Sequence, residues 1–433
     1  MRRNLAVSAA ILISLFFASP SRAQGPAAAP VSASTSARQT ETDEYTRYDL
    51  LAPDTNSFKI TYEVTATTPG AKFFFNPIRK GSTASDEAVF DAMTHDALHF
   101  EVVNGSEARK DPLMSDADPA IDYVRVTLAR RVPPNGQGRL VILKTYKDAK
   151  SYVGEGDFIV FNRPLGVKRN KIVLPAGYEL VACNVPSQVL SEPDGRVAIS
   201  FMNATATEAP LILRAKLGAQ TGPSAAPRPA NSARSREAPF QGETQRERLS
   251  ERAHQDRDIV YLLQPPETHA FSLYHDYTES RPGTDKYLNV VREGSKVSNP
   301  SAYILDTGET LPTKILTGAE LAAAKISSDE PVRPGTQIVL VPFPAIKPGQ
   351  SIRLRISETY TAPLSYDLDG DELVFDRSFG RPRNAVVLPT GWYLTASSIP
   401  ATITQLPDSR IRLDFWNDRP GSIDVLIKAK RRL

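Results

Sequence analysis

The sequence has almost no cysteine. Cys183 is the only one among 433 residues, so the chain cannot form an internal disulfide and must be held by a buried core. Many small extracellular animal domains depend on disulfides, whereas a large core without them fits a bacterial periplasmic or secreted protein. The segment around Cys183, Glu179–Val185, has the composition of a strand. It predicts a buried thiol that takes part in no chemistry.

An excess of charge of one sign is also missing. Lys and Arg together number 52, and Asp and Glu number 49. Three of the arginines, Arg2, Arg3 and Arg22, lie in the N-terminal segment discussed next, and without them each sign has 49 residues. A protein that binds nucleic acid or an anionic membrane surface generally needs a basic excess. We therefore expect no nucleic-acid partner.

Long hydrophobic runs are absent apart from the 14 residues Leu5–Ala18. This run is shorter than the ~20 apolar residues that a membrane-spanning helix requires. It follows the basic Met1–Arg3 and precedes the small residues Ser21 and Ala23, an arrangement typical of a secretory signal peptide. We predict a signal peptide over residues 1–23, no membrane insertion after its cleavage, and a periplasmic or secreted mature protein.

The sequence does contain an internal duplication. Tyr48–Phe58 aligns with Tyr261–Phe271 at an offset of 213 residues, and Phe161–Asn170 aligns with Phe375–Asn384 at an offset of 214. The latter pair shares the pattern Phe-x-Arg-x-x-Gly-x-x-Arg-Asn, and such self-similarity marks a repeated unit. The polar composition elsewhere predicts segments without a core. We expect a disordered leader over residues 24–43 and a first domain over residues 44–217. A flexible linker over residues 218–256 and a second domain over residues 257–433 follow.

Apolar residues recur with a period of two in both copies. Phe58–Val64 alternates with polar neighbours, and Arg410–Phe415 alternates over its whole length, which is typical of strands that bury one face. We predict an all-β protein of two tandem homologous antiparallel β-sandwich domains, with a β-barrel as the alternative. One helix is expected at Ala319–Lys325, and a loop at the equivalent Ser106–Ser115 of the first copy.

The repeated block provides the first candidate site. Arg163 and Arg169 in the first copy, and Arg377 and Arg383 in the second, have planar guanidinium groups that suit a carboxylate, sulfate or phosphate. The alternative is a structural role, in which an arginine pairs with Asp157. Residues kept in both copies are more often those that the fold requires, so the sequence favours the structural role.

The two tryptophans, Trp392 and Trp416, provide the second candidate site. Both lie in the second copy, where the first copy has Tyr178 and Met202. An exposed tryptophan stacks on sugars or on partner proteins, so these residues indicate a glycan or protein partner. The alternative, which the sequence favours, is that they pack between the domains.

Two weak metal sites can be recognised. One resembles the start of a calcium-binding loop and consists of Asp367, Asp369 and Asp371. Its twelfth position is Ser378 instead of Glu, so a hairpin turn is favoured. The other is the pair His95 and His99, which has the spacing of a zinc-peptidase helix but no Glu after the first histidine. We expect neither a metal nor a cofactor.

Catalytic motifs are missing as well. The sequence contains no Gly-x-Ser-x-Gly turn, no phosphate loop and no Gly-x-Gly-x-x-Gly. With the duplication and the balanced charge, this predicts an exported, non-enzymatic binding or scaffold protein of the cell envelope or secretome. The alternatives are a secreted hydrolase that acts on polysaccharide through loop carboxylates such as Asp157 and Asp371, and a purely structural envelope component.

Overall fold

The computed structural model describes residues 38–205, 207–218, 251–328 and 332–432. Strands make up 53% of the described residues and helices 5%, which confirms the all-β fold class. The predicted signal peptide, most of the leader and residues 219–250 of the linker lie outside the described residues, so these assignments stay predictions. In the part that is described, no helix has both the length and the apolar character of a membrane span.

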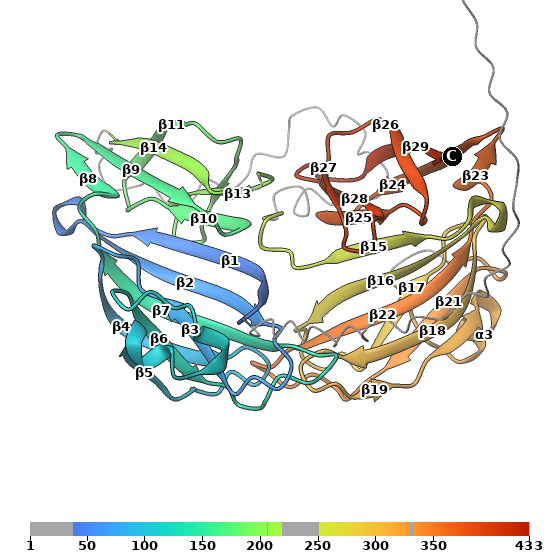
Figure 1. The fold of residues 1–433 in the computed structure, drawn as a ribbon, viewed down its shortest axis with the longest axis horizontal. Helices are drawn as coiled ribbons and strands as arrows, with labels where there is room; N and C mark the ends of the chain where they lie inside the picture. Colours follow the sequence, from blue (N-terminus) through green and yellow to red (C-terminus); the bar gives the residue numbers. More distant parts are fainter. Residues whose placement is uncertain (1–37, 206, 219–250, 329–331, 433) are drawn as a thin grey trace, which may run out of the picture. The chain divides into compact units, whose positions relative to one another are not determined.

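The first repeat, β1 to β14, folds into three sheets (Figure 1). The large sheet consists, in order, of β12 (Gln188–Ser191), β13 (Val197–Met202), β10 (Arg169–Val173), β1 (Glu41–Leu50), β2 (Ser57–Ala66), β7 (Gly138–Lys147) and β4 (Thr83–Asp91). A four-stranded sheet consists of β11 (Tyr178–Cys183), β14 (Ala209–Leu217), β9 (Phe158–Leu165) and β8 (Tyr152–Glu155). The third sheet consists of β3 (Phe73–Pro77), β6 (Asp122–Thr127) and β5 (Phe100–Asn104).

The second repeat, β15 to β29, has the same strand order with one short strand added. Its large sheet consists of β19 (Thr310–Leu311), β18 (Lys296–Ile304), β22 (Ile352–Thr361), β16 (Ala270–Glu279), β15 (Asp258–Leu263), β25 (Arg383–Val387), β28 (Ile411–Trp416) and β27 (Thr402–Gln405). The other sheets consist of β23 (Tyr366–Asp369), β24 (Glu372–Phe379), β29 (Ile423–Arg431) and β26 (Trp392–Ser397), and of β17 (Lys286–Val290), β21 (Gln337–Pro342) and β20 (Lys314–Thr317). The shared strand order shows that the two repeats have the same fold.

Each large sheet contains one parallel pair within its otherwise antiparallel order. β1 pairs in parallel with β10, and β15 pairs in parallel with β25. β10 and β25 carry the second arginine of the repeated block, whereas β9 and β24, which carry the first, belong to the four-stranded sheets. The two arginines of each block therefore lie on different sheets.

Alternation along β9 and β24 decides which residues enter the core. On β9 the buried positions are every second residue, so Arg163 shares the inward face with Phe161, and Arg377 on β24 shares it with Phe375. Phe161 meets Phe58 of the large sheet edge to face at 5.4 Å between ring centroids, and Phe375 meets Phe271 at 5.6 Å. An arginine therefore faces an aromatic core in each repeat.

The helix predicted in the second copy is present, and the loop predicted in the first copy is wrong. α3 (Gly318–Ala323) begins with a capping box in which Thr317 and Glu320 bond each other's backbone N–H groups. At the equivalent place the first repeat forms α1 (Gly105–Ala108), where the side chain of Asn104 accepts from the Glu107 N–H. The N-cap stabilises this single turn although its sequence is polar.

The aromatic core leads to a prediction about stability. Substitution Phe161→Ala removes a fully buried ring and is expected to cost about 3–5 kcal/mol of unfolding free energy. Substitution Ile212→Ala on β14, where the side chain is 44% exposed, is expected to change it by less than about 0.5 kcal/mol. Denaturant unfolding followed by circular dichroism measures both, and equal effects would contradict the assignment of the core.

Candidate functional site

In the first repeat, the arginine that enters the core has a carboxylate partner. Arg163 Nη1 donates to Asp148 Oδ2 at 2.9 Å and to Ser151 Oγ at 3.3 Å. The side chains of Arg163 and Asp148 are 6% and 7% exposed. Removing one member of such a buried pair generally leaves a costly uncompensated charge. The partner is therefore Asp148, and the predicted pairing with Asp157 was wrong.

The Asp148 carboxylate is held by further donors. Its Oδ2 accepts from Ser151 Oγ at 2.7 Å and from Ser82 Oγ at 3.3 Å. Its Oδ1 accepts from the backbone N–H groups of Lys150 and Ser151 at 3.1 and 3.2 Å. One arginine, two hydroxyls and two backbone donors thus form a cradle for a single carboxylate.

The second repeat keeps the arginine and has lost the carboxylate. Arg377 aligns with Arg163, and Ala362 aligns with Asp148. The two turns match, because the N–H groups of Ser151 and Ser365 donate to the carbonyls of Asp148 and Ala362 respectively. Both cradle hydroxyls recur, as Ser295 for Ser82 and as Ser365 for Ser151.

Arg377 is buried without an acceptor. The residue is 7% exposed, and its Nε and Nη1 atoms are buried and have no hydrogen-bond partner among the described residues. Its guanidinium lies 5.3–5.7 Å from the centroids of three rings, those of Tyr261, Phe271 and Tyr360. Ring contacts attract a cation but do not replace hydrogen bonds, so the position favours an anion.

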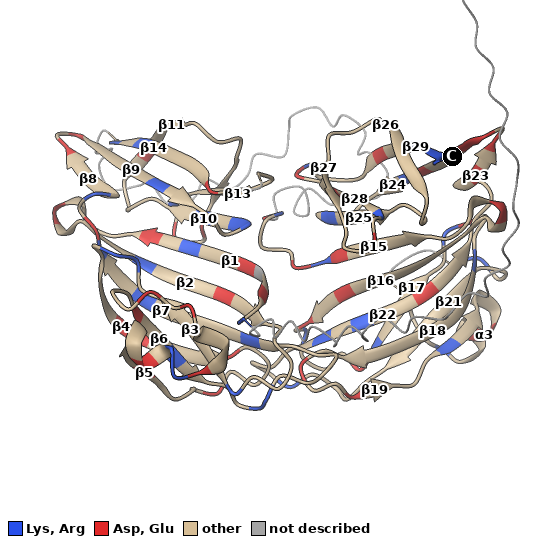
Figure 2. Ribbon diagram, viewed as in Figure 1, with Lys and Arg blue, Asp and Glu red and all other residues tan. Residues whose placement is uncertain are grey.

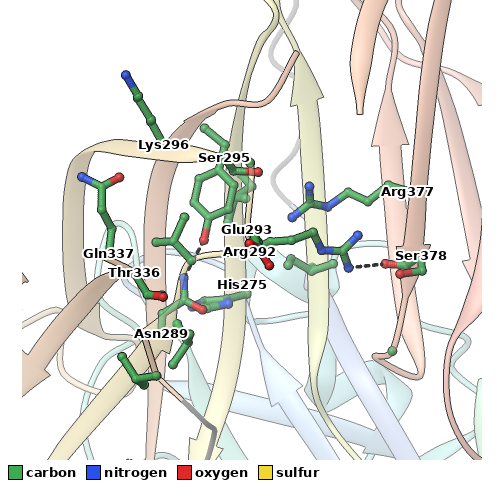
Figure 3. Close-up of a pocket in the computed structure, with 18 of the residues that line it drawn as sticks. His275, Asn289, Arg292, Glu293, Ser295, Lys296, Thr336, Gln337, Arg377 and Ser378 are labelled. Atoms are coloured by element: carbon green, nitrogen blue, oxygen red, sulfur yellow. Dashed lines mark hydrogen bonds between the residues drawn. The ribbon is translucent and has the colours of Figure 1, made fainter. Parts of the chain in front are cut away.

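Arg377 lines a pocket of about 1350 Å³ in the second repeat (Figure 3). This volume exceeds the ~300–1,000 Å³ typical of small-ligand sites. The walls come from β15 to β18, β20 to β22, β24 and β25, from the turn after β17, and from residues 332–336. The polar side chains of the lining include His275, Asn289, Arg292, Gln337, Arg381 and Asn384.

A second guanidinium lies beside Arg377. Arg292 is in the turn between β17 and β18, and its Nη2 donates to the carbonyl of Ser378 at 2.9 Å (Figure 3). Burial, and then the positive charge of Arg377, lower the pKa of Arg292. The two cations are therefore close enough to repel. Within the described part of the chain neither has a carboxylate partner, although basic and acidic residues are interspersed over both repeats (Figure 2).

A buried carboxylate lies behind the pocket wall. Glu358 is 2% exposed and accepts from Asn289 Nδ2 at 3.0 and 2.7 Å. Burial raises the pKa of Glu358 to about 6. In the first repeat the aligned residue is Lys144, whose Nζ donates to Asn76 Oδ1 at 2.5 Å. The same position thus carries opposite charges in the two repeats.

His275 adds a neutral polar group to the lining. The residue is 4% exposed, and burial lowers the pKa of its imidazole to about 3. Its Nε2 atom is buried and has no partner among the described residues. The ring packs edge to face on Tyr287 at 5.4 Å. At neutral pH this histidine supplies a hydrogen-bonding atom to the pocket and no charge.

The other two predicted arginines have structural contacts. Arg169 Nη1 donates to the carbonyls of Ala253 and His254, both at 3.1 Å, and so fixes the segment that precedes β15. Arg383 Nη2 lies 3.6 Å from Asp258 Oδ2. Of the four predicted arginines, Arg377 alone lines the large pocket.

The tryptophans do not converge with Arg377. Trp392 is 4% exposed, packs under the Arg431 guanidinium at 5.2 Å and borders a separate pocket of about 600 Å³. Trp416 is half-buried on β28, where it pairs with Arg383 of β25. A role of either residue in binding a glycan or protein stays a prediction.

The weak metal candidates have other roles. Asp367, Asp369 and Asp371 lie in the hairpin of β23 and β24, and Asp371 contacts Lys430 at 3.2 Å. No cluster of three or more possible metal ligands occurs in the described ranges. His95 has a positive φ of 64° and stacks on Phe90, so it is not helical. The Cys183 thiol is half-exposed instead of buried.

Sequence reasoning missed Ala362, Arg292 and Glu358. The signal was present, because the gap-free alignment of the copies pairs Asp148 with Ala362 and Lys144 with Glu358. Residues that are identical in the two copies reveal only what the copies share, whereas these two positions differ in charge. The pocket itself has no sequence signal, because its walls come from strands that are far apart in the chain.

No protein-family model matches the chain, and no curated protein matches it. Partial matches exist among solved structures. An M1 zinc metallopeptidase from Deinococcus radiodurans shares 12% identity over 42% of this chain and 42% of its own, with a TM-score of 0.29. A two-domain M1 zinc metallopeptidase bound to L-tryptophan shares 12% identity over 40% and 41%, with a TM-score of 0.27. An aminopeptidase N family protein from Idiomarina loihiensis shares 12% over 40% and 29%, with a TM-score of 0.24.

These matches contradict the predicted non-enzymatic binding or scaffold protein, because the matched structures are peptidases. That prediction is therefore corrected, and a distant, partial likeness to enzymes takes its place. The chain spans less than half the length of each match, and TM-scores below 0.3 carry no argument for a peptidase activity.

The Arg163–Asp148 pair leads to a second prediction. Substitution Asp148→Ala leaves a buried guanidinium uncompensated and is expected to lower the unfolding free energy by about 3–5 kcal/mol. Substitution Asp157→Ala removes the exposed acid that the sequence offered as the partner, and is expected to change it by less than about 0.5 kcal/mol. Denaturant unfolding compares the two variants, and a larger effect at Asp157 would reverse the assignment.

Glu358 leads to a prediction about pH. Its pKa rises from 4.5 in the unfolded chain to about 6 in the folded protein. The contribution of Glu358 to the free energy of unfolding is therefore complete below about pH 4.5 and is lost as the pH rises through 6. Substitution Glu358→Gln removes the ionisable group and with it this loss. The free energy of unfolding of the variant is expected to exceed that of the wild type by roughly 2 kcal/mol at pH 8 and to equal it at pH 4. Unfolding curves at both pH values measure the difference. A difference independent of pH would contradict the raised pKa.

Proposed function

We propose that the second repeat recognises an anionic ligand in the pocket lined by Arg377. The observation that carries the proposal is the Arg377 guanidinium, which is 7% exposed and has two nitrogen atoms without an acceptor. The first repeat supports it, because the aligned Arg163 donates to a carboxylate of its own chain. A bound anion would supply to the second repeat what Asp148 supplies to the first.

The energetics favour this assignment. A buried charge without hydrogen bonds is costly, whereas a hydrogen bond to a charged group contributes about 1.5–3 kcal/mol. An anion that reaches Arg377 removes the cost of the unpaired buried charge and adds the free energy of the charged hydrogen bond. The guanidinium is buried and lies close to three aromatic rings, so little side-chain entropy is lost when it binds.

The pocket leaves room for the rest of the ligand. Apolar and aromatic side chains alternate with amides and hydroxyls along its walls, as in sites that bind small molecules. The ligand is therefore a molecule with one anionic group at Arg377 and a body that extends along the pocket. The two repeats then differ in function. Arg163 of the first repeat pairs with a carboxylate of its own chain, and Arg377 of the second repeat binds the ligand.

The test is calorimetric titration of the full chain with three simple anions: benzoate, benzenesulfonate and phenyl phosphate. We expect the wild type to bind at least one of them, and the variant Arg377→Met to bind it at least about tenfold more weakly, because a charged hydrogen bond is lost. Absence of binding to all three, or equal binding by the variant, would refute the proposal.

A gain-of-partner variant sharpens the test. Substitution Ala362→Asp restores the carboxylate of the first repeat, and we expect it to raise the melting temperature by about 2–8 °C and to abolish binding of the anion. Substitution Ala362→Asn, which adds similar volume without charge, is the control and is expected to produce the smaller effect on both. Equal effects of Asp and Asn would show that volume, not charge, is responsible.

A further inference from the structure

On the basis of the anion site proposed above, we propose that the group recognised at Arg377 is a carboxylate, and that Glu358 excludes groups that carry two negative charges, such as a phosphate monoester. The inference names the chemical class of the ligand. It depends on three comparisons between the aligned residues of the two repeats.

The first comparison concerns the cradle. In the first repeat the donors around the bound oxygen atoms are Arg163, two serine hydroxyls and two backbone N–H groups of one turn. In the second repeat the arginine, both serines and the turn recur as Arg377, Ser295, Ser365 and residues 362–365. A planar group with two oxygen atoms is the acceptor that this arrangement holds in the first repeat. The second repeat has the same residue types at the aligned positions, and Arg377 and Ser295 line the pocket.

The second comparison concerns the number of charges. Arg79 aligns with Arg292, and each donates to the carbonyl that follows the block arginine, at Pro164 and Ser378 respectively. Two arginines therefore stand at this place in both repeats. In the first repeat the one carboxylate of Asp148 is sufficient for them. A single negative charge from the ligand gives Arg377 and Arg292 the same number of anionic partners as Arg163 and Arg79 have.

The third comparison concerns Glu358. It replaces Lys144 of the first repeat, so the wall behind the site changes from positive to negative. Asn289 Nδ2 links its carboxylate to Tyr360 Oη at 2.9 Å, and Tyr360 lies under Arg377. The acid thus lies one side chain away from the anion site. A second negative charge on the ligand is repelled by this buried acid, which water screens only weakly.

The acid at the rim does not have this effect. Glu293 follows Arg292 in the chain and also lines the pocket, but its side chain is 82% exposed and pairs with Arg333 at 2.6 Å. Solvent and this partner screen its charge. Of these two acids, Glu358 is therefore the one that distinguishes a ligand with one negative charge from a ligand with two.

The experiment compares the three probes at pH 8, where Glu358 is ionised. Benzoate is planar with one charge, benzenesulfonate is tetrahedral with one charge, and phenyl phosphate is tetrahedral with two charges. We expect the affinity for benzoate to exceed that for benzenesulfonate, and to exceed that for phenyl phosphate by at least about tenfold, the size of one like-charge repulsion near a protein surface.

Substitution Glu358→Gln separates charge from shape. We expect it to strengthen the binding of phenyl phosphate about tenfold and to leave the ratio of benzoate to benzenesulfonate unchanged. The matched control is Glu372→Gln on β24, an acid that pairs with Lys428 at 3.0 Å and does not line the pocket; it is expected to change no ratio.

The outcomes distinguish this inference from the proposal on which it rests. If no probe binds, both fail. If the probes bind through Arg377 but phenyl phosphate equals or exceeds benzoate in the wild type, the anion site stands and the carboxylate assignment is overturned. If benzoate is preferred and Glu358→Gln leaves the ratio to phenyl phosphate unchanged, Glu358 does not exclude the dianion and that part is overturned.

Discussion

A guanidinium in an aromatic core needs an anion, and this constraint connects the fold to the site. Alternation along β9 and β24 turns Arg163 and Arg377 inward, beside rings that cannot accept strong hydrogen bonds. In the first repeat Asp148 provides the anion, and the pair is closed within the chain. In the second repeat the fold imposes the same position on Arg377, and Ala362 provides nothing. In the second repeat a ligand therefore has to provide the anion.

Duplication explains how such a site arises without a new fold. One copy retains the closed pair and shows that the architecture tolerates an arginine in its core. Among the aligned positions at which the copies differ are Asp148, which corresponds to Ala362, and Lys144, which corresponds to Glu358. At the first position the second repeat lacks the carboxylate that accepts from the arginine. At the second position it has a negative charge near the arginine in place of a positive one. The strands that line the pocket have counterparts in the first repeat, and the remaining walls are turns and the segment 332–336.

The period-two pattern and the alignment of the copies predicted the all-β fold and its duplication, and the helical run Ala319–Lys325 predicted α3. They did not predict the parallel pairs β1–β10 and β15–β25, because periodicity gives the face of a residue but not its neighbouring strand. Asp157 was named as the partner of Arg163 because it is near in sequence, whereas the turn brings Asp148 to it. Of the candidate site, the arginines were found and the pocket was not.

Crystals of the protein soaked with 4-bromobenzoate provide the most direct measurement, because the anomalous signal of bromine locates the ligand independently of the protein phases. The account predicts a carboxylate within hydrogen-bonding distance of Arg377 Nε or Nη1 and the brominated ring in the large pocket. A ligand bound elsewhere, or an Arg377 side chain bonded to a carboxylate of its own chain, would contradict it.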